Sequence, residues 1–307
     1  MIPIVGLGLH RPMTAAELAP IAAFRPLQHD PDDVVDTAVV DGIPGAVSRH
    51  VAGADLSISV GIAELHQYAG ISGGHKGVAV GCGGRATISA LHHRDRVCAP
   101  GIQLGRLDGN PFRAAIDQLG VAARCTGALL YVPSVDRWLF GDPIEVVAEA
   151  ARLLSPWRQL SRLAPGALLR VPAVKAVSLY QASRAATYLA LSPHPPLTDG
   201  ATIAIEAACP EGLGAEAGFV RALSSSPPPW SALLTGPAPT GAGAQRAVML
   251  ALLARRYRFQ VVGCPQAAAL RAVGIDAQEA PAGPLPPGWI EVDDPFHALP
   301  QHSPDTP

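Results

Sequence analysis

A chain of 307 residues that is 49% hydrophobic and 16% charged can build two domains of ordinary size and is too apolar to be disordered throughout. The net charge is −2 and no run of lysine or arginine stands out, which excludes the basic footprint of a nucleic-acid-binding protein. No apolar stretch reaches the length of about 18 residues that a membrane-spanning helix needs. Five cysteines without a Cys-x-x-Cys pair argue against a disulfide framework or a zinc site. The start of the chain lacks a basic region and is a poor signal peptide, so we expect a cytoplasmic protein.

The first part of the chain alternates short apolar runs with loops. Residues 2–9 predict a buried strand that delivers His10 to a strand–loop junction. Thr14-Ala15-Ala16-Glu17 predicts a capping box that opens a helix. Residues 55–60 predict a second strand, which leads into a loop that holds His66. The glycines of residues 70–74 predict a turn, which is either an ordinary tight turn or one whose amides approach a ligand closely.

The later elements continue this alternation. The pattern predicts strands over residues 121–133, 201–207 and 259–262, and helices over residues 143–154, 179–191 and 244–256. Residues 155–172 are mixed in character and predict a domain joint. The alternation favours an α/β fold with mostly parallel sheets flanked by helices. We expect two domains, residues 1–160 and 161–295, with the active site in the cleft between them, and a disordered tail over residues 296–307.

Three histidines and a lysine stand at fixed spacing in loop-like segments. The segments are His10-Arg11-Pro12-Met13, His66-Gln67-Tyr68-Ala69-Gly70-Ile71-Ser72-Gly73-Gly74-His75-Lys76 and Thr87-Ile88-Ser89-Ala90-Leu91-His92. This ordered set closely resembles the nickel-dependent lactate racemase family. That family carries His-Arg-Pro-Met, His-x-x-Ala-Gly-x-Ser-Gly-Gly-x-Lys and Thr-Ile-x-x-x-His in the same order and at the same spacing. Weaker matches extend the resemblance to about residue 276. The resemblance implies that residues 1–160 form the cofactor-binding and catalytic domain.

The resemblance implies a nickel cofactor that is bound covalently. Lys76 would carry a nickel-pincer nucleotide, a pyridinium thioamide/thiocarboxylate mononucleotide, and Ser72, Gly73 and Gly74 would contact it. Tethering suits a cofactor that is used in place, because the entropy of positioning it is already lost. His92 would bind the nickel, and imidazole suits this metal. His93 is the neighbouring alternative. The enzymes that build the cofactor would be partners.

The resemblance also implies the reaction. It would be the racemisation or epimerisation of a small, lactate-like 2-hydroxy acid by reversible hydride transfer to the tethered cofactor, which makes the protein an isomerase. A racemase must serve both faces of one carbon, and His10 and His66 match the family's two acid–base histidines. Tyr180, Gln181 and Arg184 match the family's substrate-binding segment. The family has lysine in place of Arg184, and since arginine binds a carboxylate bidentately, the identity of the substrate stays open.

Two departures keep other interpretations open. The family usually has arginine where His75 stands, so a phosphate contact there would be weaker. Family members also carry about a hundred residues ahead of the position of His10, including an Asp-x-Thr-Arg-Pro motif that contacts the cofactor phosphate and the substrate. Such a motif is absent from this sequence. A second interpretation is therefore a non-catalytic or cofactor-binding remnant, and a third is a simple metal-binding α/β protein that uses His92 and His93.

Overall fold

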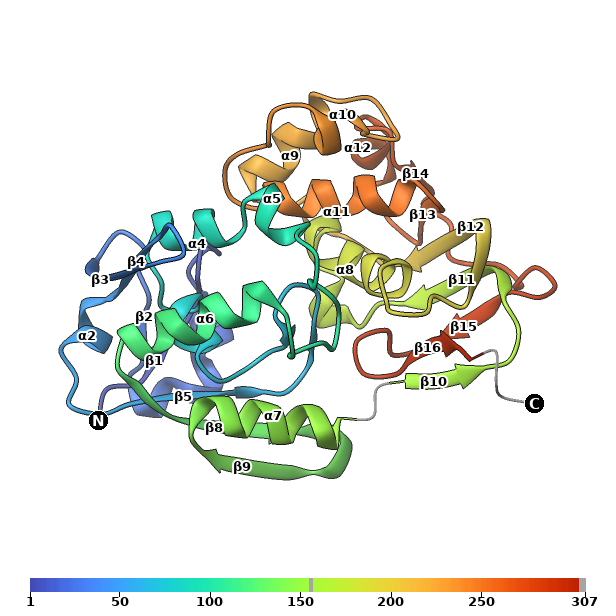
Figure 1. Ribbon diagram of the computed structural model, residues 1–307. Coiled ribbons are helices and arrows are strands. Elements are labelled where there is room, and N and C mark those ends of the chain that lie inside the picture. Colours follow the sequence, from blue (N-terminus) through green and yellow to red (C-terminus); the bar gives the residue numbers. More distant parts are fainter. Residues whose placement is uncertain (155–156, 304–307) are drawn as a thin grey trace. The chain divides into compact units, whose positions relative to one another are not determined.

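The computed structural model describes residues 1–154 and 157–303, and the chain divides into two compact units, residues 1–154 and 155–307 (Figure 1). Both units combine helices with sheets; the strand pairs of unit 2 are parallel, and unit 1 mixes parallel with antiparallel pairs. The predicted α/β class is therefore confirmed. Among the described residues, no helix is both long and apolar enough to cross a membrane.

Unit 1 begins with two small sheets. Its first elements are β1 (Ile4–Val5), α1 (Ala15–Leu18), η1 (Ala19–Phe24), β2 (Leu27–Gln28), β3 (Val34–Val40), β4 (Ile43–Ser48) and α2 (Arg49–Ala52). β1 pairs in parallel with β2, and β3 forms an antiparallel hairpin with β4. The predicted capping box is present, because the Thr14 hydroxyl accepts from the Glu17 amide and the Glu17 carboxylate accepts from the Thr14 amide. The predicted strand over residues 2–9 is confined to β1.

The main sheet of unit 1 has the strand order β5–β8–β9, made of β5 (Ser57–Ile62), β8 (Cys125–Val132) and β9 (Arg137–Gly141). β5 and β8 are parallel, and β9 is antiparallel to β8. Figure 1 shows α7 (Pro143–Leu153) lying along β8 and β9, where Val146, Val147 and Ala150 are buried. The face of this sheet that points away from α7 is apolar yet exposed. Val60 is 65% exposed and Phe140 is 69% exposed.

The remaining elements of unit 1 surround its central loops. They are β6 (Leu65–His66), β7 (Gly70–Ile71), α3 (Lys76–Ala79), α4 (Arg85–Leu91), α5 (Arg94–Val97), α6 (Pro111–Ala122) and η2 (Pro133–Val135). β6 and β7 form a two-stranded antiparallel pair, so His66 lies beside Gly70. α6 begins at Asn110, whose side-chain oxygen accepts from the amides of Phe112 and Arg113.

Unit 2 is built on a parallel sheet with the strand order β14–β13–β12–β11–β15. Its strands are β11 (Ala164–Arg170), β12 (Leu197–Glu206), β13 (Arg258–Val262), β14 (Asp276–Ala277) and β15 (Ile290–Val292). The helices are η3 (Ala173–Lys175), α8 (Leu179–Ala190), α9 (Ala217–Ser224), α10 (Ala232–Thr235), α11 (Ala244–Ala254) and α12 (Ala267–Arg271). β11 lies within the segment predicted to be a domain joint. That prediction is wrong for residues 164–170, which form an inner strand.

The end of the described chain is ordered. β16 (Leu299–His302) pairs in parallel with β10 (Trp157–Leu160), and Phe296 and Leu299 are 2% and 0% exposed. The prediction of disorder from residue 296 onward is therefore wrong for residues 296–303, because two large apolar side chains there are buried. Residues 304–307 lie outside the described part of the chain.

Candidate functional site

His10, His66, Lys76 and His92 all lie in unit 1. His10 is exposed and follows a turn in which its amide donates to the Leu7 carbonyl at 3.0 Å. Just before it, the Gly8 amide donates to the carbonyl of Gly81 at 2.9 Å. Gly81 follows α3, the helix that begins at Lys76, so the backbone that presents His10 is fixed to the segment that presents Lys76.

Tyr68 brings two of the predicted histidines together. Its ring is 2% exposed and lies 5.7 Å, centroid to centroid, from the ring of His66 and 5.7 Å from the ring of His92, edge-on to both. Phe112 adds contacts of 5.6 Å to Tyr68 and 5.4 Å to His92. Aromatic pairs at such distances favour edge-to-face arrangements, which restrict the orientation of each ring. His66 and His92, which are far apart in the sequence, therefore share one aromatic cluster.

The backbone around His66 fixes the orientation of its ring. The Nδ1 atom of His66 accepts hydrogen bonds from the amides of Tyr68 at 3.3 Å and Ala69 at 3.0 Å. The turn continues through Gly70, which has a φ of +74°, and a Cβ atom there would lie 2.0 Å from the carbonyl oxygen of Arg106. Only glycine satisfies both conditions without strain.

His92 and His93 differ in their surroundings. His92 is the C-cap of α4, is half-buried, and places its Nδ1 atom 2.9 Å from the carbonyl oxygen of Ile88. A carbonyl can only accept, so the proton lies on Nδ1 and the lone pair on Nε2, as in histidines that bind metals. His93 is exposed and caps α5, where its Nδ1 atom accepts from the Asp95 amide. The local geometry thus favours His92 over His93 as a ligand.

The residues between His66 and Lys76 pack against their own unit. The Ser72 hydroxyl donates to the Ile62 carbonyl at 2.6 Å and accepts from the Glu64 amide at 2.9 Å. Gly73 and Gly74 have φ values of +98° and +59°. A Cβ atom would lie 2.5 Å from Leu130 at the first position and 2.7 Å from the Pro143 carbonyl at the second. The sequence left open whether these glycines approach a ligand, and close packing accounts for them without one. Lys76 follows as the half-buried first residue of α3.

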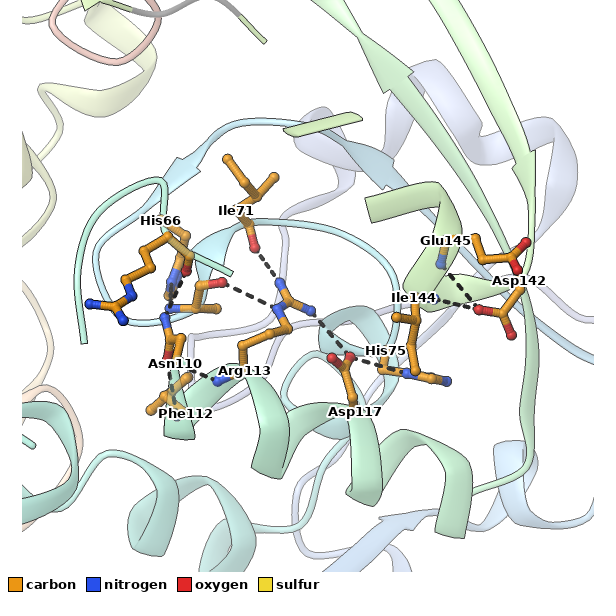
Figure 2. A network of polar contacts seen from close by, with 12 residues as sticks. His66, Ile71, His75, Asn110, Phe112, Arg113, Asp117, Asp142, Ile144 and Glu145 are labelled. Atoms are coloured by element: carbon orange, nitrogen blue, oxygen red, sulfur yellow. Dashed lines mark hydrogen bonds and ion pairs between the residues drawn. The ribbon is translucent and has the colours of Figure 1, made fainter. Parts of the chain in front are cut away.

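A buried charge network on α6, which was not predicted from the sequence, holds this segment in place. Figure 2 shows Arg113 between the loop and Asp117, with His75 on the far side of Asp117. The Arg113 guanidinium donates to the carbonyls of Ala69 and Ile71 and lies 3.4 Å from the Asp117 carboxylate. Burial lowers the pKa of Arg113, and the charge of Asp117 opposes that shift.

His75 belongs to the same network. Its ring is 1% exposed, and its Nδ1 atom lies 3.2 Å from the Asp117 carboxylate. A Cβ atom at Gly120 would lie 2.4 Å from the His75 ring, so that glycine leaves room for it. The sequence predicted that any phosphate contact at this position would be weaker, and the buried side chain of His75 points into the unit. The Arg113–Asp117 spacing of four residues on a helix was the available signal.

The predicted substrate residues lie in unit 2, on α8. Arg184 donates to the side-chain oxygen of Gln181 and to the Tyr188 hydroxyl, both at 3.2 Å. Its guanidinium carbon lies 6.0 Å from the centroid of the Phe296 ring. Tyr180 is 8% exposed and packs edge-on against Phe219, and burial raises its pKa. The helix therefore groups Gln181 with Arg184 and places Tyr180 in the core.

The described residues contain no cluster of three or more His, Cys, Asp or Glu side chains arranged to hold a metal ion. His92 could thus contribute one ligand, and further donors would have to come from a bound group. All five cysteines are free thiols. Burial raises the pKa of Cys82 to about 11 and that of Cys209 to about 12, so neither is poised as a thiolate ligand.

Comparisons with known proteins show what this chain resembles. Residues 1–104 match the family described as the lactate racemase N-terminal domain. A stretch of 149 residues is 27% identical to the lactate racemase of Lactiplantibacillus plantarum, and it covers 45% of this chain and 35% of that protein. The chain thus spans about a third of the curated relative that it matches.

Two solved structures share the fold. The lactate racemase apoprotein from Thermoanaerobacterium thermosaccharolyticum superposes with a TM-score of 0.81 at 18% identity, over 97% of this chain and 78% of that chain. A protein from Thermotoga maritima superposes with a TM-score of 0.73 at 14% identity, over 98% of this chain and 85% of that chain. Residues 1–104 thus match the lactate racemase N-terminal domain family, and the chain shares the fold of a lactate racemase apoprotein.

Proposed function

We propose that this chain is an isomerase that racemises or epimerises a small 2-hydroxy acid such as lactate. The observation that carries the proposal is the grouping of His66 and His92 around Tyr68, in the same unit as Lys76. Two imidazoles with different hydrogen-bond partners suit two different tasks, proton handling and metal binding. The match of residues 1–104 to the lactate racemase N-terminal domain supports this class of reaction.

The side chains fit a tethered nickel cofactor. His92 would bind nickel through Nε2. The hydrogen bond between Nδ1 and the Ile88 carbonyl places the proton of the neutral ring on Nδ1, which leaves the lone pair on Nε2. Lys76 would hold a nickel-pincer nucleotide covalently, and the donors that His92 lacks would come from that nucleotide. When bound, the group supplies a hydride acceptor for the substrate carbon. The backbone beside Ser72, Gly73 and Gly74 would keep the tether in place, since these residues are fixed to the core.

The other proposed roles belong to substrate binding and proton handling. His10 and His66 would serve the substrate hydroxyl. Gln181 and Arg184 would hold the carboxylate, for which a guanidinium offers two parallel donors. The free thiols agree with a reducing cytoplasm, and the enzymes that build the cofactor would be partners.

The test uses the chain's two lysines, Lys76 and Lys175. Protein made together with the cofactor-building enzymes should show added mass on the peptide that contains Lys76, and it should racemise at least one member of a panel of 2-hydroxy acids. Lys76→Arg should lose both the mass and the activity, whereas Lys175→Arg should keep the mass. Activity in protein with unmodified Lys76 would refute the tether. Added mass with no turnover of any panel member would favour the cofactor-binding remnant.

A second prediction separates His92 from His93. His92→Ala should abolish nickel retention after gel filtration, because it removes the imidazole lone pair. His93→Ala should keep the nickel and lose only about 1 kcal/mol of unfolding free energy, since it removes a helix cap. Nickel content is measured by mass spectrometry of the digested protein. The reverse pattern would show that the ligand is His93.

A further inference from the structure

The sheet β5–β8–β9 of unit 1 has an apolar outward face, on the side away from α7. Alternate side chains of the three strands point to this face. They are Ile58, Val60 and Ile62 of β5, Leu129 and Tyr131 of β8, and Trp138 and Phe140 of β9. We propose that the outward face binds the same face of a second copy of this chain, so that the protein is a two-fold symmetric dimer.

The register of the strands aligns these side chains in rows that cross the whole sheet. In one row, Val60 is paired with Leu129, and Leu129 is paired with Phe140. The next row consists of Ile62, Tyr131 and Trp138. The rings of Tyr131 and Trp138 lie 5.2 Å apart, centroid to centroid. The outward face is therefore one continuous apolar surface and not a set of scattered side chains.

The rows also meet over Gly127, the β8 residue that is paired with Ile58. A Cβ atom at Gly127 would lie 3.5 Å from the side chain of Ile58 and 3.8 Å from the ring of Phe140. Side chains of the two outer strands thus approach each other above the middle strand. This contact keeps the surface apolar at the one outward position of β8 that has no side chain.

The inner face of the same sheet is filled by helices of unit 1. α3 packs against β5, and α6 and α7 pack against β8. Ala128, Leu130 and Val132 of β8 point to this face and are buried. β5 and β8 are parallel, and parallel strands occur almost only in sheets that are covered on both faces. The outward face is apolar like the inner one, as expected of a sheet that is covered on both sides.

The exposed area of the outward face is close to one half of a stable interface. Besides Val60 and Phe140, Trp138 is 59% exposed and Ile62 is 49% exposed. Because a large aromatic side chain presents about 150–250 Å², the seven side chains together expose roughly 600 Å². A stable interface buries about 800 Å² on each partner, so the apolar centre alone would supply most of it. Monomers expose contiguous apolar patches of at most about 300–600 Å².

The chemistry of the outward face fits a copy of itself as the partner. None of its seven side chains is charged, and Tyr131, Trp138 and Phe140 are aromatic. The centres of protein interfaces are depleted of charged residues and enriched in these aromatic types. Two-fold symmetry places the same patch on both sides, so that apolar rows meet apolar rows. The two sheets would then pack face to face, about 10 Å apart, as in a β-sandwich.

Analytical ultracentrifugation of the full chain tests the dimer. At about 50 µM, well above the micromolar dissociation constants at the weak end for interfaces of standard size, the protein should sediment with twice the mass of one chain. The double variant Val60→Lys/Phe140→Lys should sediment as a monomer, because it places ammonium groups in an apolar contact. Both side chains are exposed in the single chain, so circular dichroism should show that the variant stays folded.

The matched control is Val174→Lys. Val174 is 81% exposed and lies in η3 of unit 2, outside the outward face. This variant should remain a dimer. A monomeric wild-type protein would overturn the proposal. So would a dimer that survives Val60→Lys/Phe140→Lys, or one that is lost equally in Val174→Lys.

Fluorescence quenching tests which surface forms the contact. The difference in emission between the wild-type protein and Trp138→Phe isolates Trp138 from the other three tryptophans. The emission of Trp138 should be protected from iodide in the dimer and quenched in Val60→Lys/Phe140→Lys. Equal quenching of Trp138 in the dimer and in the monomeric variant would show that the copies bind through another surface, which would refute the proposal. None of these measurements depends on the proposed reaction.

Discussion

Replacing His10 with alanine should lower racemisation about 10²- to 10⁴-fold in both directions, the usual cost of losing a group that transfers a proton in the transition state. Both directions should suffer, because every turnover moves the hydroxyl proton off and back. His10 is exposed, so the variant should melt close to the temperature of the parent protein. The measurement is the initial rate from each pure enantiomer of the best substrate.

A matched control is His50→Ala. His50 is an exposed histidine in α2, and no proposed role involves it, so its removal should leave both rates unchanged. His66→Ala should resemble His10→Ala in losing both directions, because a full cycle would use both histidines. Near-normal turnover in His10→Ala would mean that His10 does not transfer the proton.

Replacing Asp117 with alanine should lower the free energy of unfolding by about 3–5 kcal/mol, because it leaves the Arg113 guanidinium buried without its countercharge. His75 would lose its partner as well. The measurement is urea denaturation followed by circular dichroism. Adding Arg113→Met to Asp117→Ala should recover part of this loss, since the uncompensated charge is removed.

The control for Asp117 is an exposed ion pair of similar spacing. Glu149 and Arg152 pair at 2.8 Å on α7, with side chains 43% and 72% exposed. Glu149→Ala should cost less than about 1 kcal/mol, because water already solvates both charges. Equal losses for Asp117→Ala and Glu149→Ala would show that the buried network adds nothing to stability.

Much of the fold could be predicted because its signals are local. The predicted helix over residues 143–154 is α7, and the predicted strand over residues 259–262 lies within β13. In both elements, apolar side chains recur at the spacing of that element, every three to four residues in the helix and every second residue in the strand. β11 could not be predicted in this way, because its Pro165 and Gly166 imitate a turn. A Cβ atom at Gly166 would lie 2.3 Å from the ring of Trp289, so a distant residue explains that glycine.

The same distinction between local sequence patterns and distant contacts applies to the candidate site. The spacing of His66, Lys76 and His92 could be found from the sequence because it is a one-dimensional pattern. The burial of His75 could not, since it depends on Asp117 and Gly120, which approach only when α6 folds against the loop. The division between His92 and His93 needed the geometry of two helix ends, where one histidine closes α4 and the other opens α5.

The close packing of the segment from His66 to Lys76 also restricts how this protein can diversify. At Gly70, Gly73 and Gly74 any side chain would collide with the unit's own atoms, and the carbonyls of Ala69 and Ile71 are held by Arg113. Most substitutions there would be removed by misfolding before they could alter selectivity. Variants with new substrate preferences should therefore be sought at positions outside this segment, and a mutant library aimed at Arg184 and its neighbours should contain more folded members than one aimed at the glycines.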